Sequence, residues 1–451
     1  MPKKKTALTI EERLQQALVP AEEQPYEVPE NWVWVRLGEV NKYMSKSVNP
    51  ISEPDKTFEL YSVPSMADNY PEIIVGSDIG SSKQSVCKGD VLLCKINPRI
   101  NRVWKVSQFT DNELIASSEW IIIRNNHIDA NYLMYCFQSK YFREFMLSNV
   151  SGVGGSLMRA QPKYVQTYPI PLPPLSEQQR IVERIEELFA KLDEAKERLQ
   201  EVVDSFAVRK AAILHKAFTG ELTQQWRREN GVSDESWEDV SLDSVCKSIY
   251  DGDHMPPPKS ETGIPFLVIS NVNTGFISFE KCRFVPEEYY DGLSETRTPE
   301  IGDILYTIVG SYGIPVMVDT DKKFCFQRHM ALLKPKDIYN RFLWRQLQTQ
   351  SFFEQATSIA TGTAQLTVPI KGLRKLIVKC PILPEQHEIV RLIDNLLARE
   401  RSAQQATEQA LASIDLMKKS ILARAFRGEL GTNKASEASA LELLKQVLAE
   451  N

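Results

Sequence analysis

The sequence has few of the residues that cross-link small secreted domains or hold structural metals. Its cysteines are odd in number, scattered along 451 residues, and never spaced as Cys-x-x-Cys. This argues against a disulfide framework and against a zinc site. We therefore expect buried, reduced thiols at all seven positions. They are Cys87, Cys94, Cys136, Cys246, Cys282, Cys325 and Cys380.

Long hydrophobic runs are also missing. No apolar stretch approaches the ~18 residues that a membrane-spanning helix needs. The lysines at positions 3–5 are followed by only a few uncharged residues, so no signal peptide is predicted. With 42% hydrophobic and 25% charged residues, the composition is that of a soluble globular protein. We expect a cytoplasmic location and no membrane contact.

Motifs for catalysis are lacking as well. The sequence has no G-x-x-x-x-G-K-[ST] phosphate loop and no Asn-Pro-Pro-Tyr motif of the kind that grips a flipped adenine. Residues 152–156 (Gly-Val-Gly-Gly-Ser) depart from G-x-G-x-x-G at Leu157, and we interpret them as a flexible loop. Residues 251–254 (Asp-Gly-Asp-His) have no partner cluster, so we interpret them as a turn and not as a metal site. These observations predict a protein that is not an enzyme.

A net positive charge is absent too. The chain has 54 Lys and Arg against 59 Asp and Glu, a formal net charge of −5. This mildly disfavours a nucleic-acid binder, because phosphate contacts need cations. Local clustering matters more than the total, however, so DNA binding stays open.

What the sequence does contain is a repeat. Residues 177–182 (Glu-Gln-Gln-Arg-Ile-Val) return 208 positions later as residues 385–390 (Glu-Gln-His-Glu-Ile-Val). Residues 213–222, which end in Phe-Thr-Gly-Glu-Leu, return at the same offset as residues 421–430, which end in Phe-Arg-Gly-Glu-Leu. Two separated matches at one offset indicate an internal duplication.

The segments between these matches have a helical heptad pattern. In the first copy the apolar positions alternate in steps of four and three, as in a coiled-coil seam: Ile181, Ile185, Leu188, Leu192, Ala195, Leu199, Val202 and Phe206. The second copy runs from Ile389 through Met417 to Ile421, and Glu400, Ala403 and Thr407 weaken its middle, which we expect to lean on a partner. Prolines before and glycines after both segments favour long helices over 175–222 and 384–430.

The parts outside the helices also resemble each other. Residues 32–37 resemble 237–242, and residues 89–93 (Gly-Asp-Val-Leu-Leu) resemble 302–306 (Gly-Asp-Ile-Leu-Tyr). The predicted class is α+β: two mixed α/β domains separated by two long antiparallel helices that form a coiled coil, with approximate two-fold symmetry. A rod of ~60 Å is under two turns of B-DNA at ~34 Å each, so it suits two separated half-sites. The expected segments are 1–30, 31–174, 175–222, 223–383, 384–430 and 431–451.

These features resemble the specificity subunits of type I restriction-modification systems. The resemblance is carried by residues 169–178 (Pro-Ile-Pro-Leu-Pro-Pro-Leu-Ser-Glu-Gln), by residues 216–222 (Lys-Ala-Phe-Thr-Gly-Glu-Leu), and by the start of the first domain at 32–38. It extends from about residue 30 to 430. The second helix begins with Pro-Glu-Gln at 384–386 and lacks the Pro-Leu-Ser that precedes Glu-Gln in the first copy.

The resemblance implies a non-catalytic role. Each globular part would be a target recognition domain for one half of a split, asymmetric sequence in double-stranded DNA, with the helices setting the spacer. The chain would dock two methyltransferase subunits, and restriction subunits would complete the complex. It would hold no cofactor itself, because S-adenosylmethionine, ATP and Mg²⁺ would belong to the partner subunits.

The sequence also suggests where DNA is contacted. Arginine pairs with guanine and asparagine with adenine in the major groove, and both alternate in residues 95–102. The candidates in the first domain are Lys83, Lys95, Asn97, Arg99, Asn101, Arg102, Gly155, Ser156 and Arg159. Those in the second domain are His254, Lys259, Ser311, Tyr312, Gln327, Arg328, His329, Thr361, Thr363 and Gln365. Residues 361–365 align loosely with 154–159 of the first domain.

Two further expectations stay open. Residues 10–19 and 438–448 have helical spacing and lie outside the repeat, and we expect them to pack on each other or on a partner. The alternative to a DNA reader is a coiled-coil scaffold that binds no DNA and joins two protein-interaction domains.

Overall fold

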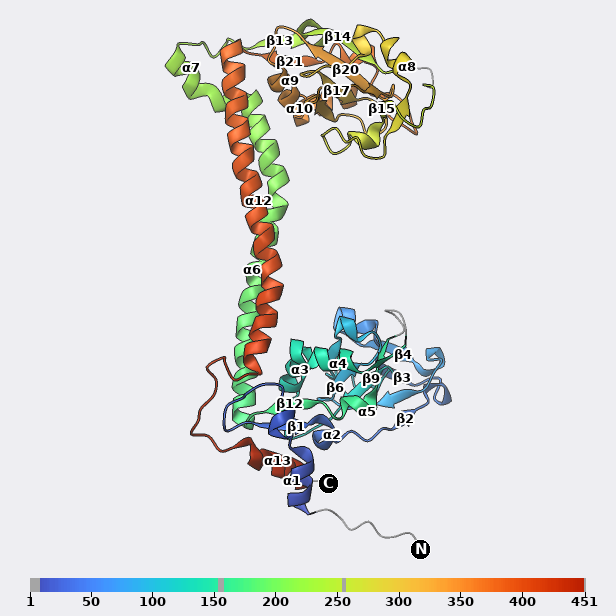
Figure 1. The fold of residues 1–451 in the computed structure, drawn as a ribbon, viewed down its shortest axis with the longest axis vertical. Coiled ribbons are helices and arrows are strands. Elements are labelled where there is room, and N and C mark those ends of the chain that lie inside the picture. The colour runs from blue at the N-terminus through green and yellow to red at the C-terminus, as the bar shows by residue number, and fades with distance from the viewer. Residues whose placement is uncertain (1–8, 153–157, 254–256, 450–451) are drawn as a thin grey trace. The chain divides into compact units, whose positions relative to one another are not determined.

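The computed structural model describes residues 9–152, 158–253 and 257–449. The chain divides into two compact units. Unit 1 comprises residues 1–198 and 410–451, and unit 2 comprises residues 199–409. The two long helices, α6 (Leu175–Phe218) and α12 (Leu383–Ala425), are each shared between the units, so each unit holds a globular part and a stretch of both helices (Figure 1).

Within unit 1 the two long helices run in opposite directions. Lys418 of α12 donates a 2.5 Å hydrogen bond to Asp193 of α6, and Lys196 pairs with Asp415 at 3.9 Å. Residue numbers therefore rise along one helix as they fall along the other. This confirms the predicted antiparallel packing.

Within unit 2 a charged contact between the two long helices explains the weak middle of the second heptad seam. Glu400 occupies a seam position and forms a 2.9 Å ion pair with Arg209 of α6. The ends of the seam are tight, because Ile181 and Ile185 in unit 1 and Ile389 in unit 2 are fully buried. A polar residue in this seam is therefore matched by a charge on the neighbouring helix.

Three predicted seam positions are wrong. Val202 is 38% exposed and Met417 is 50% exposed, and Ala403 is exposed as well. With two helices in the seam, one flank of each helix stays uncovered where no globular part packs against it. Apolar side chains on that flank remain at the surface.

Both long helices end at glycines in the left-handed region. Gly220 follows α6 with φ 82°, and Gly428 follows α12 with φ 73°. Glycine adopts this conformation without steric cost, which is why it commonly terminates helices. At Gly428 a side chain would also meet the Pro29 ring, 2.4 Å from the added Cβ. The repeated Gly-Glu-Leu is thus a helix-ending signal.

The repeated Glu-Gln pair ties each long helix to its globular part. Gln178 accepts a 2.8 Å hydrogen bond from the Asp129 N–H and donates 2.9 Å to the Pro173 carbonyl. In unit 2 Gln386 makes the equivalent contacts with Tyr339 and Pro381, both at 2.8 Å. Buried polar groups are normally satisfied in this way. The repeated Glu-Gln pair therefore connects each long helix to its globular part through buried hydrogen bonds.

The globular part of unit 1 is built on antiparallel and mixed sheets. A two-stranded sheet pairs the first and last strands of this part, and a three-stranded sheet and a five-stranded sheet lie between them in sequence. The sheets are β1 (Val33–Arg36) with β12 (Pro169–Leu172); β7 (Val103–Lys105), β6 (Val91–Cys94) and β9 (Trp120–Ile123); β2 (Ser47–Val48), β5 (Lys83–Ser85), β8 (Glu113–Ala116), β3 (Thr57–Tyr61) and β4 (Glu72–Val75); and β10 (Val150–Ser151) with β11 (Arg159–Ala160). The shorter helices are α1 (Ile10–Ala17), α2 (Leu37–Val40), α3 (Ala130–Gln138), α4 (Lys140–Ser148), α5 (Pro162–Val165) and α13 (Ala440–Ala449).

Unit 2 repeats this plan with different additions. Its first and last strands pair in the same way, and the hairpin β17–β18 with β20 corresponds to β6–β7 with β9. The sheets are β13 (Glu238–Ser241) with β21 (Ile377–Cys380); β14 (Cys246–Asp251), β20 (Met330–Pro335), β17 (Ile304–Thr307) and β18 (Pro315–Met317); and β16 (Arg283–Val285), β15 (Ile264–Leu267) and β19 (Cys325–Phe326). The shorter helices are α7 (Gln224–Asn230), α8 (Glu287–Asp291), α9 (Asn340–Gln346), α10 (Gln350–Ser358) and α11 (Ile370–Leu373).

The segments outside the repeat pack on each other. Arg13 of α1 donates a 3.0 Å hydrogen bond to the Leu448 carbonyl at the end of α13. Leu444, Val447 and Leu448 are buried in the main core of unit 1. Of the two expectations for these segments, mutual packing is the one observed (Figure 1).

The seven cysteines are free thiols. Cys94, Cys136, Cys246 and Cys325 are buried, and Cys282 and Cys380 are partly buried. The expectation of burial is wrong for Cys87, which is exposed in the turn before β6. Among the described helices, none combines the length and apolar character required to cross a membrane.

Candidate nucleic-acid interface

In unit 1 the loop between β6 and β7 carries most of the predicted contacts. The main chain of Asn97 donates a 2.8 Å hydrogen bond to Met158, and Ala160 donates 2.8 Å to the Lys95 carbonyl. Residues 95–102 and 158–160 therefore lie side by side. The structure brings Lys95, Asn97 and Arg159 together, although Asn97 and Arg159 are 62 positions apart in the sequence.

The two asparagines of this loop have a backbone role. Asn97 has φ 45° and Asn101 has φ 49°, both in the left-handed region. Asparagine tolerates this conformation better than most residues with a side chain. The Asn101 amide also donates a 3.2 Å hydrogen bond to the Gln138 carbonyl at the end of α3. The loop conformation therefore accounts for both asparagines, whatever else their side chains contact.

The cations of the unit 1 loop differ in accessibility. Arg99 is exposed in the single turn of 3-10 helix Pro98–Ile100. Arg102 is partly buried beside the Cys94 thiol. Burial raises the pKa of this thiol, and the positive charge of Arg102 offsets part of that rise. Arg159 lies 3.4 Å from the Glu119 carboxylate, so its charge is partly neutralised. Of these arginines, Arg99 is the most available to phosphate or base.

Lys83 lies on a different sheet from this loop. It belongs to β5 in the five-stranded sheet, and its Nζ donates 2.9 Å and 2.7 Å bonds to the Ser81 carbonyl and hydroxyl. Burial lowers its pKa. No described contact joins it to residues 95–102.

Unit 2 builds its β17–β18 loop on the same main-chain frame. Gly310 donates a 2.9 Å hydrogen bond to the Leu366 carbonyl, and Val368 donates 2.8 Å to Ile308. Gly310 (φ 71°) and Gly313 (φ 90°) take the left-handed positions that Asn97 and Asn101 hold in unit 1. The two loops are thus structural equivalents. Their side chains differ: Ser311 and Tyr312 form the tip in unit 2.

Of the other predicted segments of unit 2, residues 327–329 join this loop. Ile308 donates a 2.9 Å hydrogen bond to the His329 carbonyl, and Gln327 forms a parallel bridge with Asp253. Burial, and then the charge of Arg328, lowers the pKa of His329. His329 is therefore mainly neutral at pH 7. Arg328 and Lys259 are exposed cations.

Residues 361–367 complete this surface. Thr361 and Thr367 exchange two 2.8 Å main-chain hydrogen bonds, which close a turn whose side chains, including Thr363, are exposed. The Gln365 amide lies against Gly310, 3.0 Å from where a Cβ would be. Leu366 and Met158 bond to equivalent loop residues, whereas most of the segment that was aligned with 361–365 lies outside the described residues, so that alignment stays a prediction. Gly155, Ser156 and His254 lie outside the described residues.

The support that α4 and α10 give to the loops was not predicted from the sequence. Arg143 of α4 donates a hydrogen bond to the Arg99 carbonyl, and Phe353 of α10 stacks on Tyr312. A sequence pattern shared by the two domains could have indicated these equivalent helices. Each helix is capped by a hydroxyl residue, Ser139 or Thr349, and buries a phenylalanine three residues later.

Comparison with known proteins identifies the family. Residues 29–204 and 234–411 match the family model described as Type I restriction modification DNA specificity domain. The chain belongs to this family. It contains two such specificity domains. Each is made of a globular part and most of the long helix that follows it in the sequence, α6 in the first domain and α12 in the second.

Relatives and solved structures agree with this assignment. The Type I restriction enzyme EcoBI specificity subunit from Escherichia coli is 29% identical over 304 residues, which cover 62% of this chain and 64% of that protein. This match spans less than two thirds of the EcoBI subunit. The MjaVIII specificity subunit from Methanocaldococcus jannaschii is 26% identical over 406 residues, covering 86% of this chain and 92% of that protein. The crystal structure of the HsdS subunit from Thermoanaerobacter tengcongensis has a similar fold, with a TM-score of 0.65, 22% identity, and coverage of 90% and 99%.

Neither specificity domain presents a metal cluster among the described residues. In the second domain Asp253 accepts a 3.2 Å hydrogen bond from the Tyr289 hydroxyl, and the Asp251 carbonyl accepts 3.0 Å from Arg297. The turn predicted for residues 251–254 is wrong for 251–253, because Asp251 is the last residue of β14 and Asp253 forms a parallel bridge with Gln327.

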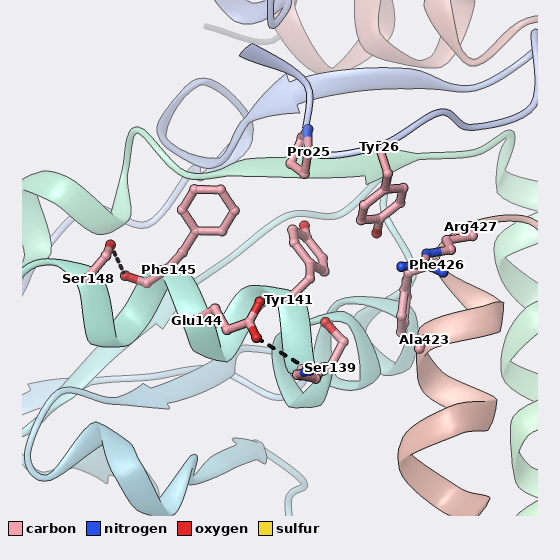
Figure 2. Close-up of a pocket in the computed structure, with 11 residues that line it drawn as sticks. Pro25, Tyr26, Ser139, Tyr141, Glu144, Phe145, Ser148, Ala423, Phe426 and Arg427 are labelled. Atoms are coloured by element: carbon pink, nitrogen blue, oxygen red, sulfur yellow. Dashed lines mark hydrogen bonds and ion pairs between the residues drawn. The ribbon is translucent and has the colours of Figure 1, made fainter.

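Unit 1 contains a cavity of about 520 Å³ that is separate from the loop (Figure 2). Its lining comes from residues 25–26, from α4 and from the end of α12. Tyr26, Tyr141, Phe145 and Phe426 contribute most of its aromatic surface, and Arg427 lies at one side. No predicted DNA-contacting residue lines it, so it does not extend the candidate interface.

Proposed function

We propose that this chain is the DNA-sequence specificity subunit of a type I restriction-modification complex, in which each domain reads one half of a bipartite, asymmetric target. The observation that carries this proposal is the pair of equivalent hairpin loops with different tips. A shared main-chain frame presents Arg99 in unit 1 and Tyr312 in unit 2. Side chains of different chemistry select different base edges, so two such loops read unlike half-sites.

The proposal includes partners and their chemistry. The long helices set the spacer and dock two methyltransferase subunits, and restriction subunits complete the assembly. Adjacent exposed apolar residues on α12 support a docking role: Leu416 is 64% exposed and Met417 is 50% exposed. Contiguous exposed apolar residues often mark interaction surfaces. The chain itself is non-catalytic and holds no cofactor, and S-adenosylmethionine, ATP and Mg²⁺ bind the partner subunits.

The test is to co-express the chain with its methyltransferase subunit and to map methylated bases by sequencing. We expect one split motif with an unread spacer, and no methylation at this motif from the methyltransferase subunit alone. Affinity of the complex for duplex DNA should fall steeply with salt, because phosphate contacts release counterions. Methylation that does not depend on this chain, or a continuous motif, would overturn the proposal.

The competing scaffold function makes the opposite prediction. A scaffold without DNA contacts would leave the salt dependence of the methyltransferase unchanged when the chain is added. It would also leave the methylated motif unchanged when residues 95–102 are replaced. The two functions are therefore distinguished in one set of measurements.

A further inference from the structure

Two residues outside the reading loops occupy equivalent positions in the two units. Arg143 lies four residues after Ser139, the N-cap of α4, and Phe353 lies four residues after Thr349, the N-cap of α10. Each follows a buried phenylalanine of its helix. The side chains at these two positions therefore leave equivalent helices at the same turn, beside the hairpin loop of each unit.

In unit 1 this position holds the loop through its main chain. The Arg143 guanidinium donates from Nη2 to the carbonyl of Arg99, the exposed cation at the loop tip. The contact leaves the Arg99 side chain free to point away from the protein. A charged donor strengthens such a bond relative to a neutral one. Arg143 thus fixes the direction of the tip without occupying it.

In unit 2 the equivalent position uses an aromatic ring. The rings of Phe353 and Tyr312 are parallel, with centroids 5.4 Å apart and planes 8° apart. The Tyr312 hydroxyl also bonds to Thr357 one turn further along α10, at 3.1 Å. The Phe353 ring fills the space beside Gly313, 2.5 Å from where a Cβ would be. The tip is therefore held by stacking, and the loop must carry glycine at 313.

We propose that Arg143 and Phe353 are positioning residues that set which base each loop selects, each acting on its own half-site. This rests on the proposed function and deepens it. The position on the helix is a brace: in unit 1 a guanidinium holds the main chain at Arg99, and in unit 2 an aromatic ring stacks on the Tyr312 side chain. Base discrimination depends on hydrogen-bond geometry at the groove edge. A tip that loses its brace samples several orientations and discriminates less.

The experiment uses the full chain in complex with its methyltransferase subunit and determines the methylated motif of each variant. In unit 1 the variants are Arg143→Met, which keeps the length and loses the donor, and Arg143→Lys, which keeps a charged donor. In unit 2 they are Phe353→Leu, which cannot stack, and Phe353→Tyr, which can. Lys140→Ala and Glu354→Ala are the controls, since these exposed residues lie on the same two helices.

We expect Arg143→Met to relax the preference in one half of the motif by about tenfold and to leave the other half intact. Phe353→Leu should relax the opposite half. The lysine and tyrosine variants should restore most of the discrimination, and both controls should match the wild type. The slope of affinity against salt should stay unchanged, because neither substitution removes a phosphate contact.

A general loss of folding would lower methylation at all sites without changing the motif, and would contradict the positioning role. Unchanged motifs in both variants would likewise overturn this inference, while a split motif in the wild type would still support the proposed function. Absence of a split motif in the wild type would instead overturn the proposed function itself. If Phe353→Leu accumulates poorly, Phe353→Met replaces it, because methionine fills a similar volume and also cannot stack on Tyr312.

Discussion

The indole Nε1 of Trp32 donates a 2.8 Å hydrogen bond to the fully buried carboxylate of Glu177. In unit 2 Trp237 makes the equivalent contact with Glu385 at 3.1 Å. Each bond joins the residue just before the first strand of a globular part to the start of a long helix. The surroundings differ, since Glu385 also forms a 2.7 Å ion pair with buried Arg227.

This difference predicts unequal effects of removing the charge. Glu385→Gln should destabilise unit 2 by about 3 kcal/mol, because it leaves the buried Arg227 guanidinium with half of its compensation. Glu177→Gln should destabilise unit 1 by about 1 kcal/mol, since its partners there are neutral donors. Hydrogen exchange of peptides from each unit measures both effects. Equal losses in the two variants would contradict the assignment of the ion pair as the cause.

The C-terminal segment predicts a stability effect of its own. Deleting residues 435–451 removes Leu444, Val447 and Leu448 from the core of unit 1 and breaks the 2.7 Å ion pair between Glu437 and Arg180. Burial of each large apolar side chain contributes ~1.5–3 kcal/mol. We expect faster hydrogen exchange in α1 and around Trp32, with unit 2 unaffected.

The same deletion tests a partner role for this segment. If methyltransferase binding falls in proportion to the loss of folded unit 1, the segment acts through folding alone. Binding that is lost while exchange in unit 1 stays slow would show that the segment contacts the partner directly.

The thiols should differ in reactivity with pH. Burial raises the pKa of Cys136, Cys246 and Cys325 to about 12. Because the thiolate is the reactive form, these three stay protonated and unreactive in the folded protein between pH 7 and 9. Iodoacetamide should label exposed Cys87 first, and all seven thiols after unfolding in guanidinium. Peptide mass spectrometry reads out the sites, and rapid labelling of Cys136 in the folded chain would be inconsistent with its burial.

Arg102→Ala tests the assignment of individual contacts. If Arg102 contacts a base, its loss should relax one half-site at a cost of ~1–3 kcal/mol and leave the other half unchanged. Lys88→Ala is the matched control, because Lys88 is exposed at the opposite end of β6 from the loop. Binding assays on specific and random duplexes decide the outcome. An equal loss on both duplexes would show a phosphate contact.

The helices and the duplication could be predicted from the sequence because they depend on local periodicity. Heptad spacing sets the buried face of a helix wherever it packs, and prolines and glycines mark its ends. Glu400 shows the limit of this reasoning. It breaks the apolar pattern, and nothing local indicates that Arg209 of the other helix would meet it at 2.9 Å.

The candidate site was predicted in part, for a similar reason. Loops such as 308–313, 327–329 and 361–365 could be selected by composition, and the structure brings them together through main-chain hydrogen bonds. Lys83 was included because it is close in sequence to other lysines, but strand pairing places it in another sheet. Phe353 was missed because an aromatic residue in a helix usually indicates a core position, and here it is 37% exposed.

Residues in the left-handed backbone conformation and main-chain hydrogen bonds determine the shape of both hairpin loops. The fold therefore does not depend on which side chains stand at the loop tips. Substitution at Arg99 or Ser311 would disturb no hydrogen bond of this frame. Such positions can drift under selection while the rest of the domain stays intact. Under the proposed function, a lineage could in this way acquire a new target sequence through a handful of substitutions, without rebuilding the domain that carries them.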